Sequence, residues 1–203
     1  EVGLFSASSV MMGWLGTLPL AAHGIALQIT SATFMVHLGL SNVATIRAGR
    51  AVGARDRVSL RQGALVVVVT SAVVALLTIA LLLGMPEPLI GLFLGPDEPA
   101  RAQVIAIGTA LLAAAALFQF ADAAQVMALG LLRGLQDTRI PMIMAAVSYW
   151  VIGVPASYVM GFTLGFGGIG VWLGLALGLA LAGVLMMTRF WRRLARGAEL
   201  VPA

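Results

Sequence analysis

Three polar side chains recur at every third position within the long apolar stretch 103–132. They are Gln119, Asp122 and Gln125, and at about 100° per residue of an α-helix they share one face. A carboxylate in hydrocarbon is costly, so Asp122 should face a bundle interior or a wet cavity, where it marks a path for an ion or a substrate. A carboxylate held in place only by hydrogen bonds, with a structural role, is the alternative.

A second carboxylate, Glu1, opens the apolar run EVGLFSASSVMMGWLG, and Phe5 follows one helical turn later. Taken alone, an acid at this place is most simply a charge at a helix N-terminus, where the helix dipole favours it. Because the chain begins with Glu1 rather than Met, we expect a fragment of a longer polypeptide. In that case Glu1 would lie inside a helix.

The composition is typical of a membrane protein, with 61% hydrophobic and 10% charged residues. Soluble domains carry about 25% charged residues. The chain has no cysteine, which excludes disulfides, thiolate metal sites and a cysteine nucleophile. We also find no nucleophile–His–acid arrangement, phosphate-binding loop or paired-histidine metal spacing, so the sequence does not predict an enzyme. The few basic residues lie between apolar runs, and a nucleic acid is not an expected partner.

Apolar segments of about 20 residues can span a bilayer as helices. Five segments reach this length and a shorter one precedes them, which predicts an all-α polytopic membrane protein with a six-helix bundle. The expected helices are Val2–Leu15, truncated at its front, and then 18–46, 64–85, 102–132, 141–164 and 169–188. The apolar segment 87–97 is too short to span and is expected to form an external interfacial turn or short helix.

All twelve basic residues are arginines, and most of them fall in three groups separated by pairs of expected helices. These groups are Arg47, Arg50, Arg55, Arg57 and Arg61; Arg133 and Arg139; and Arg189, Arg192, Arg193 and Arg196. The opposite side carries Glu87, Asp97, Glu98 and Arg101. The positive-inside rule therefore places the arginine-rich side, with the tail 189–203, in the cytoplasm. The lipid bilayer is the expected partner of the apolar surface.

Three further residues could carry a role. Asp137 lies in the turn LLRGLQDTRIP, where it could cap the following helix or form an ion pair with Arg133 or Arg139 in a gating or structural loop. His23 and His37 both belong to the helix expected at 18–46. A histidine near a helix end is usually structural, which fits His23, whereas His37 lies deeper and no partner can be named for it.

Several stretches together resemble the C-terminal half of multidrug and toxic compound extrusion (MATE) transporters of the NorM-like branch. They are EVGLF, MGWLGTLPLAAHGIALQI, FMVHLGLSNVATIRAGRAVG, LFQFADAAQVMALGLLRGLQDTRIPM and YWVIGVPASYVMG, which extend the resemblance from Glu1 to about Phe190. The most specific part is FQ–x–x–D–x–x–Q followed by LRG–x–x–DT–x–x–P. The resemblance implies two six-helix lobes related by pseudo-symmetry. Residues 1–203 would be the second lobe, helices seven to twelve, and the first lobe of the same polypeptide would be missing.

The resemblance also implies a function, the export of cationic amphipathic drugs in antiport with Na⁺ or H⁺, and it implies no cofactor.

 The coupling ion is thus the only small ligand implied besides the drug. In NorM-like members an acidic residue on helix seven and one on helix ten bind the coupling cation, and Glu1 and Asp122 occupy the matching positions. If the ion is Na⁺, these two carboxylates are its expected metal ligands, with Gln119, Gln125 and Phe5 completing the site. Two departures from the family pattern stand out: His37 replaces a common proline, and Gly24 replaces the glutamine that often follows the histidine of helix eight.

Two other functions remain open at this stage. A lipid-linked oligosaccharide flippase of the same broad fold would be expected to line its cavity with cationic residues, whereas the intramembrane charge here is acidic. A non-transporting membrane scaffold would have no reason to keep Asp122 in hydrocarbon. The sequence does not choose between Na⁺ and H⁺, and it does not identify the drug. The expected location is a bacterial inner membrane, with the C-terminus in the cytoplasm.

Overall fold

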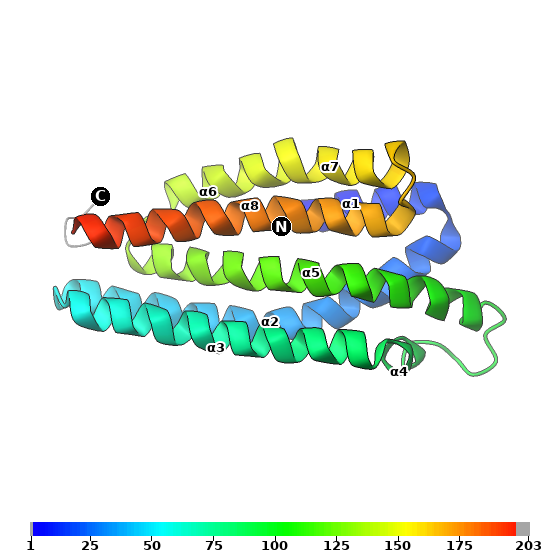
Figure 1. Ribbon diagram of the computed structural model, residues 1–203, viewed down its shortest axis with the longest axis horizontal. Coiled ribbons are helices and arrows are strands. Elements are labelled where there is room, and N and C mark those ends of the chain that lie inside the picture. The colour runs from blue at the N-terminus through cyan, green and yellow to red at the C-terminus, as the bar shows by residue number, and fades with distance from the viewer. Residues whose placement is uncertain (1, 198–203) are drawn as a thin grey trace.

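The computed structural model of the protein describes residues 2–197, and in this range it contains helices and turns but no β-strand. Figure 1 shows an elongated bundle in which α5 lies between α2 and α3 on one side and α6, α7 and α8 on the other. The elements are α1 (Val2–Leu15), α2 (Thr17–Gly53), α3 (Arg57–Gly84), α4 (Pro86–Gly91), α5 (Arg101–Gly134), α6 (Arg139–Ala146), η1 (Val147–Gly153), α7 (Val154–Tyr158), η2 (Val159–Thr163) and α8 (Gly167–Arg196). Glu1 lies outside the described residues.

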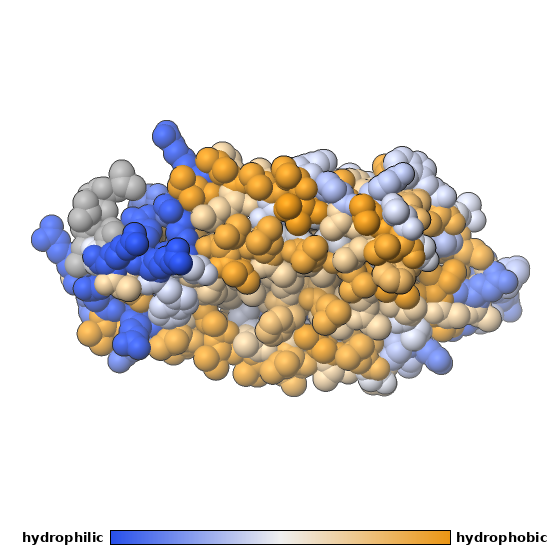
Figure 2. Space-filling view, turned by 45° about the horizontal axis from the view of Figure 1, so that its top comes forward, coloured by the Kyte–Doolittle hydropathy of each residue, from blue (hydrophilic) through white to orange (hydrophobic). Residues whose placement is uncertain are grey.

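The length and polarity of these helices confirm an all-α integral membrane protein. Among residues 2–197, five helices are long and apolar enough to span a bilayer: α2, α3, α5, the composite helix Arg139–Thr163 and α8. The remaining expected helix, α1 at the start of the chain, is apolar but shorter, with 14 residues. Figure 2 shows apolar side chains over the middle of the molecule and hydrophilic side chains gathered at its ends. This is the surface that a bilayer requires.

Several helices extend further than their apolar runs predicted. The second helix continues to Gly53 instead of ending at Ile46, α3 begins at Arg57, and α8 continues to Arg196. Arginine has a high helix propensity, and its long stem lies along apolar surface while its charged head reaches water. Most arginines therefore occupy the first or last helical turns at one end of the bundle, called the Arg-rich end below, whereas Arg55 lies in the connecting turn.

The central helix, α5, packs against α2 at very short range. A Cβ atom at Gly134 would lie 2.6 Å from the Cβ atom of Ala48, so only glycine fits there. Two hydroxyls of α2 donate hydrogen bonds to the α5 backbone: Ser41 to the Val126 carbonyl at 2.9 Å and Thr45 to the Gly130 carbonyl at 2.9 Å. Small residues and interhelical hydrogen bonds are the usual means of helix association in a membrane.

The fifth span departs from the regular helix expected at 141–164. It contains two π-helical segments, η1 and η2, on either side of the short α7, near whose start Pro155 lies. Proline lacks an N–H group and breaks the regular helical hydrogen-bond pattern, which accounts for an interruption here. This span packs closely on α8, where a Cβ atom at Gly178 would lie 2.9 Å from the Cα atom of Gly153.

The segment 87–97 begins within a short helix, α4, and continues as turns towards α5. Ile90 of α4 is buried against α5, where a Cβ atom at Gly108 would lie 2.8 Å from the Ile90 Cδ1 atom. The Arg101 guanidinium donates to the Leu94 carbonyl at 2.7 Å and thereby ties the turn to the first turn of α5. The segment is therefore a folded connection at the end of the bundle opposite the Arg-rich end.

Candidate functional site

The polar face of α5 is buried inside the bundle. Gln119, Asp122 and Gln125 are 0%, 3% and 1% exposed, although the helix that carries them is long and apolar enough to span a membrane. The amide oxygen of Gln119 accepts a hydrogen bond from the Thr33 hydroxyl of α2 at 3.1 Å. Helical spacing therefore places the three side chains away from lipid, at the centre of the protein.

Two polar atoms of this face lack a hydrogen-bond partner within residues 2–197. They are Nε2 of Gln119 and Oε1 of Gln125, and both are buried. The arginines lie at the ends of the bundle, and the nearest one on the same helix, Arg133, is about three helical turns beyond Asp122. The surroundings that α5 itself gives Asp122 are therefore neutral amides and apolar side chains.

An aromatic cluster covers this face on the side away from the Arg-rich end. Phe118 precedes Asp122 by one turn of α5, and it contacts Phe5 of α1 and Trp172 of α8 edge-on, with ring centroids 5.8 Å and 5.3 Å apart. Trp172 in turn contacts His23 of α2, with centroids 5.6 Å apart. Phe5 thus contacts α5 through Phe118. It is part of a four-ring cluster that joins four helices.

Hydrogen bonds determine which nitrogen of the neutral His23 ring carries the hydrogen. The Trp172 indole, which can only donate, donates to Nδ1 of His23 at 3.1 Å, so the neutral ring carries its hydrogen on Nε2. That nitrogen lies 3.3 Å from the hydroxyl oxygens of both Ser8 and Ser9, which themselves donate to the Phe5 carbonyl. His23 therefore ties α1, α2 and α8 together, which agrees with a structural role.

The other histidine, His37, has a partner that could not be named from the sequence. Its Nδ1 atom lies 3.0 Å from the Ser71 hydroxyl of α3, and both residues are buried. Within the described residues its Nε2 atom has no hydrogen-bond partner. His37 thus belongs to the contact between α2 and α3 rather than to the polar face of α5.

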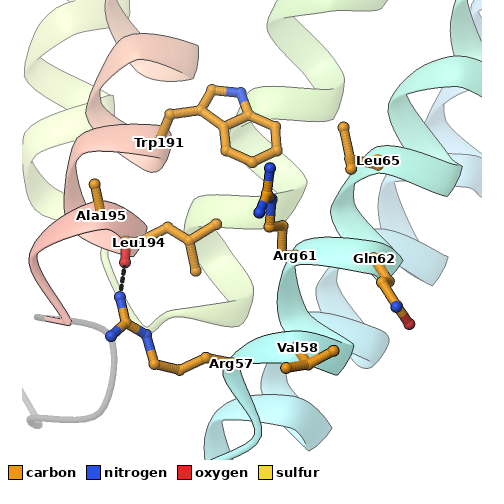
Figure 3. Close-up of a pocket in the computed structure, with 8 residues that line it drawn as sticks. All are labelled: Arg57, Val58, Arg61, Gln62, Leu65, Trp191, Leu194 and Ala195. Atoms are coloured by element: carbon orange, nitrogen blue, oxygen red, sulfur yellow. Dashed lines mark hydrogen bonds between the residues drawn. The ribbon is translucent and has the colours of Figure 1, made fainter.

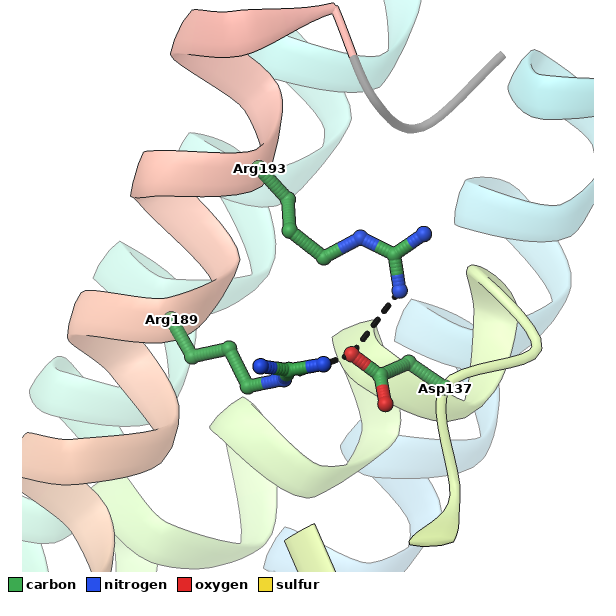
Figure 4. A network of polar contacts seen from close by, with 3 residues as sticks. All are labelled: Asp137, Arg189 and Arg193. Carbon is green, nitrogen blue, oxygen red and sulfur yellow. Dashed lines mark hydrogen bonds and ion pairs between the residues drawn. The ribbon is translucent and has the colours of Figure 1, made fainter. Parts of the chain in front are cut away.

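Asp137 is held by the end of α8 (Figure 4). Its Oδ2 atom accepts from Arg189 Nε at 2.7 Å and from Arg193 Nη1 at 2.8 Å. Burial opposes ionisation, but the hydrogen bonds and charges of the two guanidiniums outweigh it, so the pKa of this carboxyl lies below its ordinary value. The prediction of a local ion pair with Arg133 or Arg139 is therefore wrong, because the partners lie on α8.

Asp137 does not take the alternative role of a helix cap either, since Thr138 occupies the N-cap position of α6 and makes no side-chain capping bond. Arg139 begins α6 and is exposed, while Arg133 ends α5. Arg133 lines a cavity of about 430 Å³ between α5 and the α6–η1 segment. Because Gln125 and Tyr149 line the same cavity, it connects the neighbourhood of the Arg-rich end with the polar face of α5.

Glu1 and Asp122 are the two carboxylates expected to bind a cation. Glu1 lies outside the described residues, whereas Asp122 lies inside the bundle. Within residues 2–197, His, Asp and Glu side chains form no group of three or more that could hold a metal ion. Any cation site around Asp122 therefore draws its further ligands from amide, hydroxyl or backbone oxygens, or from residues outside this range.

Comparisons with known proteins agree with this architecture. The family model MatE matches residues 1–159. The chain is 44% identical over 196 residues to a probable multidrug resistance protein NorM of Rhizobium meliloti, covering 97% of this chain and 42% of that protein. It is 46% identical over 190 residues to the protein of the same name from Agrobacterium fabrum, covering 94% and 41%. The chain thus spans about two fifths of the length of these relatives.

Solved structures show the same fold. An outward-facing multidrug resistance MATE family transporter matches with a TM-score of 0.83 at 18% identity, over 96% of this chain and 42% of that one. The eukaryotic MATE transporter AtDTX14 matches with a TM-score of 0.79 at 19% identity, over 95% and 44%. With the family match over most of the chain, these likenesses establish that the protein belongs to the MatE family.

Proposed function

We propose that the chain is the second lobe of a secondary active exporter that moves cationic amphipathic compounds out of the cell in antiport with Na⁺ or H⁺. The observation that carries the proposal is the burial of Asp122, between two glutamines, in the middle of a helix long enough to span a membrane. An ionisable residue at such a place is costly and typically functional. The names of the relatives, multidrug resistance proteins, support the same function.

The donor atoms near Asp122 fit a hard cation, which prefers oxygen ligands. The buried Gln125 Oε1 atom accepts no hydrogen bond within residues 2–197. Thr33 has one hydroxyl hydrogen and two acceptors in range, the Thr30 carbonyl at 2.8 Å and Gln119 Oε1 at 3.1 Å. A half-turn of the Gln119 amide would let its nitrogen donate to Thr33 and would release its oxygen. A carboxylate and two amide oxygens would then be available to Na⁺, while a proton needs only the carboxylate.

Exchange follows from the cost of a charge in a region of low dielectric. Ionised Asp122 attracts a cation, and either the coupling ion or a cationic drug can neutralise it. Because one carboxylate favours one cation at a time, binding of the coupling ion favours release of the drug. Glu1, four residues before Phe5 in the sequence, is the proposed second carboxylate. Rocking of this lobe against the first lobe of the same polypeptide would give alternating access.

The proposed setting is the bacterial inner membrane, with the Arg-rich end and the C-terminus in the cytoplasm. The arginines at that end come from the α2–α3 connection, the end of α5, the start of α6 and the end of α8. Cytoplasmic segments of membrane proteins carry such an excess of basic residues. In this orientation the cavity that reaches Gln125 lies in the cytoplasmic half of the bundle.

The test uses the complete polypeptide that contains this chain, reconstituted in vesicles. Export of a fluorescent lipophilic cation is followed first under an imposed Na⁺ gradient and then under an imposed pH gradient, for the wild type and for Asp122→Asn. We expect one gradient to drive export, and we expect the substitution to reduce the driven rate at least ~tenfold. The matched control is Asp97→Asn, which removes the same charge from an exposed turn outside the spanning helices.

The outcomes separate the alternatives. If neither gradient drives export in the wild type, the drug-export proposal is wrong, and a flippase or a scaffold must be considered. If Asp122→Asn transports as well as Asp97→Asn, the carboxylate is not the coupling group. The gradient that drives export identifies the ion.

A further inference from the structure

A cavity of about 810 Å³ opens at the Arg-rich end between the first turns of α3 and the last turns of α8 (Figure 3). One wall carries Arg57, Arg61 and Leu65 of α3, and the other carries Trp191 and Leu194 of α8. The volume is in the range of pockets that hold molecules of drug size. Among the described residues, the lining combines two guanidiniums and one amide with apolar side chains, and it includes no acidic residue.

The two guanidiniums have different surroundings. Arg57 donates to the Leu194 carbonyl, one of the last carbonyls of α8, and thereby joins the two walls. Arg61 extends toward the Trp191 ring in Figure 3, and within residues 2–197 it makes no hydrogen bond or ion pair. A guanidinium that reaches into such a cavity suits a phosphate group, because its fork of N–H donors matches the phosphate oxygens.

The cavity lies where the outer surface changes from charged to apolar. One turn beyond Arg61, Leu65 is 44% exposed, and the next turns of α3 expose Val69 and Leu76, which are 59% exposed each. In a membrane protein these side chains meet hydrocarbon. Trp191 on the opposite wall is the kind of residue that lies at the boundary between head groups and acyl chains. The cavity is thus positive at its aqueous side and apolar towards the bilayer.

The geometry points to a binding site for an anionic phospholipid, with the phosphodiester on Arg61 and Arg57 and an acyl chain along Leu65 and Trp191. An inorganic phosphate would leave the apolar wall uncovered. A zwitterionic lipid would bring an ammonium group beside two guanidiniums, and this repulsion gives the site its preference for a headgroup with net negative charge. The site differs from the polar face of α5 in its residues, its charge and its place in the bundle.

The test measures lipid binding to the complete polypeptide in detergent by native mass spectrometry. Phosphatidylglycerol is titrated against the wild type, Arg61→Gln and Arg61→Lys, with phosphatidylcholine of the same acyl chains and inorganic phosphate as separate probes. We expect one preferred phosphatidylglycerol molecule per protein, and about a tenfold lower affinity in Arg61→Gln, because hydrogen bonds to a charged group are lost. Arg61→Lys should keep more of the affinity than Arg61→Gln, because it keeps the charge.

The matched control is Arg192→Gln. Arg192 is exposed on α8 beside Trp191 but does not line the cavity, so its loss should change the affinity by no more than about twofold. Equal losses in Arg61→Gln and Arg192→Gln would show a diffuse attraction to the Arg-rich end and would overturn the site. Equal binding of phosphatidylcholine, or phosphate binding as tight as that of the lipid, would overturn it too. Because binding is measured without transport, these outcomes leave the export proposal untouched.

Discussion

Two buried carboxylates of this protein, Asp122 and Asp137, differ in what surrounds them. They are 3% and 6% exposed, so both are removed from water. Asp137 accepts hydrogen bonds from two guanidiniums that belong to the same chain, whereas the polar residues beside Asp122 on α5 are Gln119 and Gln125. A charge neutralised by fixed arginines cannot be exchanged without breaking the structure. From this contrast we infer that Asp137 stabilises the folded protein, and we propose that Asp122 binds an exchangeable cation.

The largest expected effect separates transport from stability at Asp122. Asp122→Asn keeps the shape of the side chain and removes its charge, so gradient-driven export should fall at least ~tenfold in the complete protein. The free energy of unfolding should stay the same or rise, because replacing a buried charge by a neutral group is often neutral or stabilising. Thermal unfolding in detergent checks the second part. If the midpoint falls as far as it does for Asp137→Asn, the contrast between the two carboxylates is wrong.

The opposite result is expected at Asp137. Asp137→Asn replaces the charged acceptor of two hydrogen bonds by a neutral amide and leaves Arg189 and Arg193 facing each other without their counter-charge. We expect the protein to lose about 2 kcal/mol of unfolding free energy. Transport per folded molecule should remain near that of the wild type. Thermal unfolding and reconstituted export measure the two quantities, with Asp97→Asn as the exposed control, and a loss of export at unchanged stability would contradict the prediction.

The same ion pairs predict a pH dependence of stability. Because the folded pKa of Asp137 is lowered, its contribution is fully present above the ordinary value of about 4 and is lost as the pH falls through the lower folded value. The difference in unfolding midpoint between the wild type and Asp137→Asn should therefore be constant from about pH 6 to 8 and shrink below about pH 4. A difference that instead disappears between pH 6 and 8 would mean that another group is responsible.

The sequence was sufficient for the features that depend on one helix. An apolar run of sufficient length predicts a spanning helix, and spacing by three places Gln119, Asp122 and Gln125 on one face. The bounds of α1, Val2–Leu15, also agree with the prediction. These features are local, because the helical period alone relates the residues to one another.

Features that depend on two helices could not be predicted in the same way. Asp137 and Arg189 are 52 residues apart, and the closer Arg133 and Arg139 gave a plausible but wrong pair. The hydrogen bond between Trp172 and His23 joins residues 149 apart, and the sequence contains no local signal for it. At the Arg-rich end the predicted helices were several residues too short, because hydropathy indicates where hydrocarbon ends, not where the helix ends.

The smallest expected effect concerns the amides beside Asp122. Thr33→Val removes the hydroxyl that contacts Gln119, so the amide is held less firmly and the concentration of coupling ion at half-maximal export should rise by up to about fivefold. The matched control, Thr45→Val, removes a hydroxyl that bonds the Gly130 carbonyl of the same helix. It should lower stability by about 1 kcal/mol and leave the ion dependence unchanged. If both variants shift the ion dependence equally, the whole contact between α2 and α5, rather than the orientation of Gln119, determines how Asp122 meets its cation.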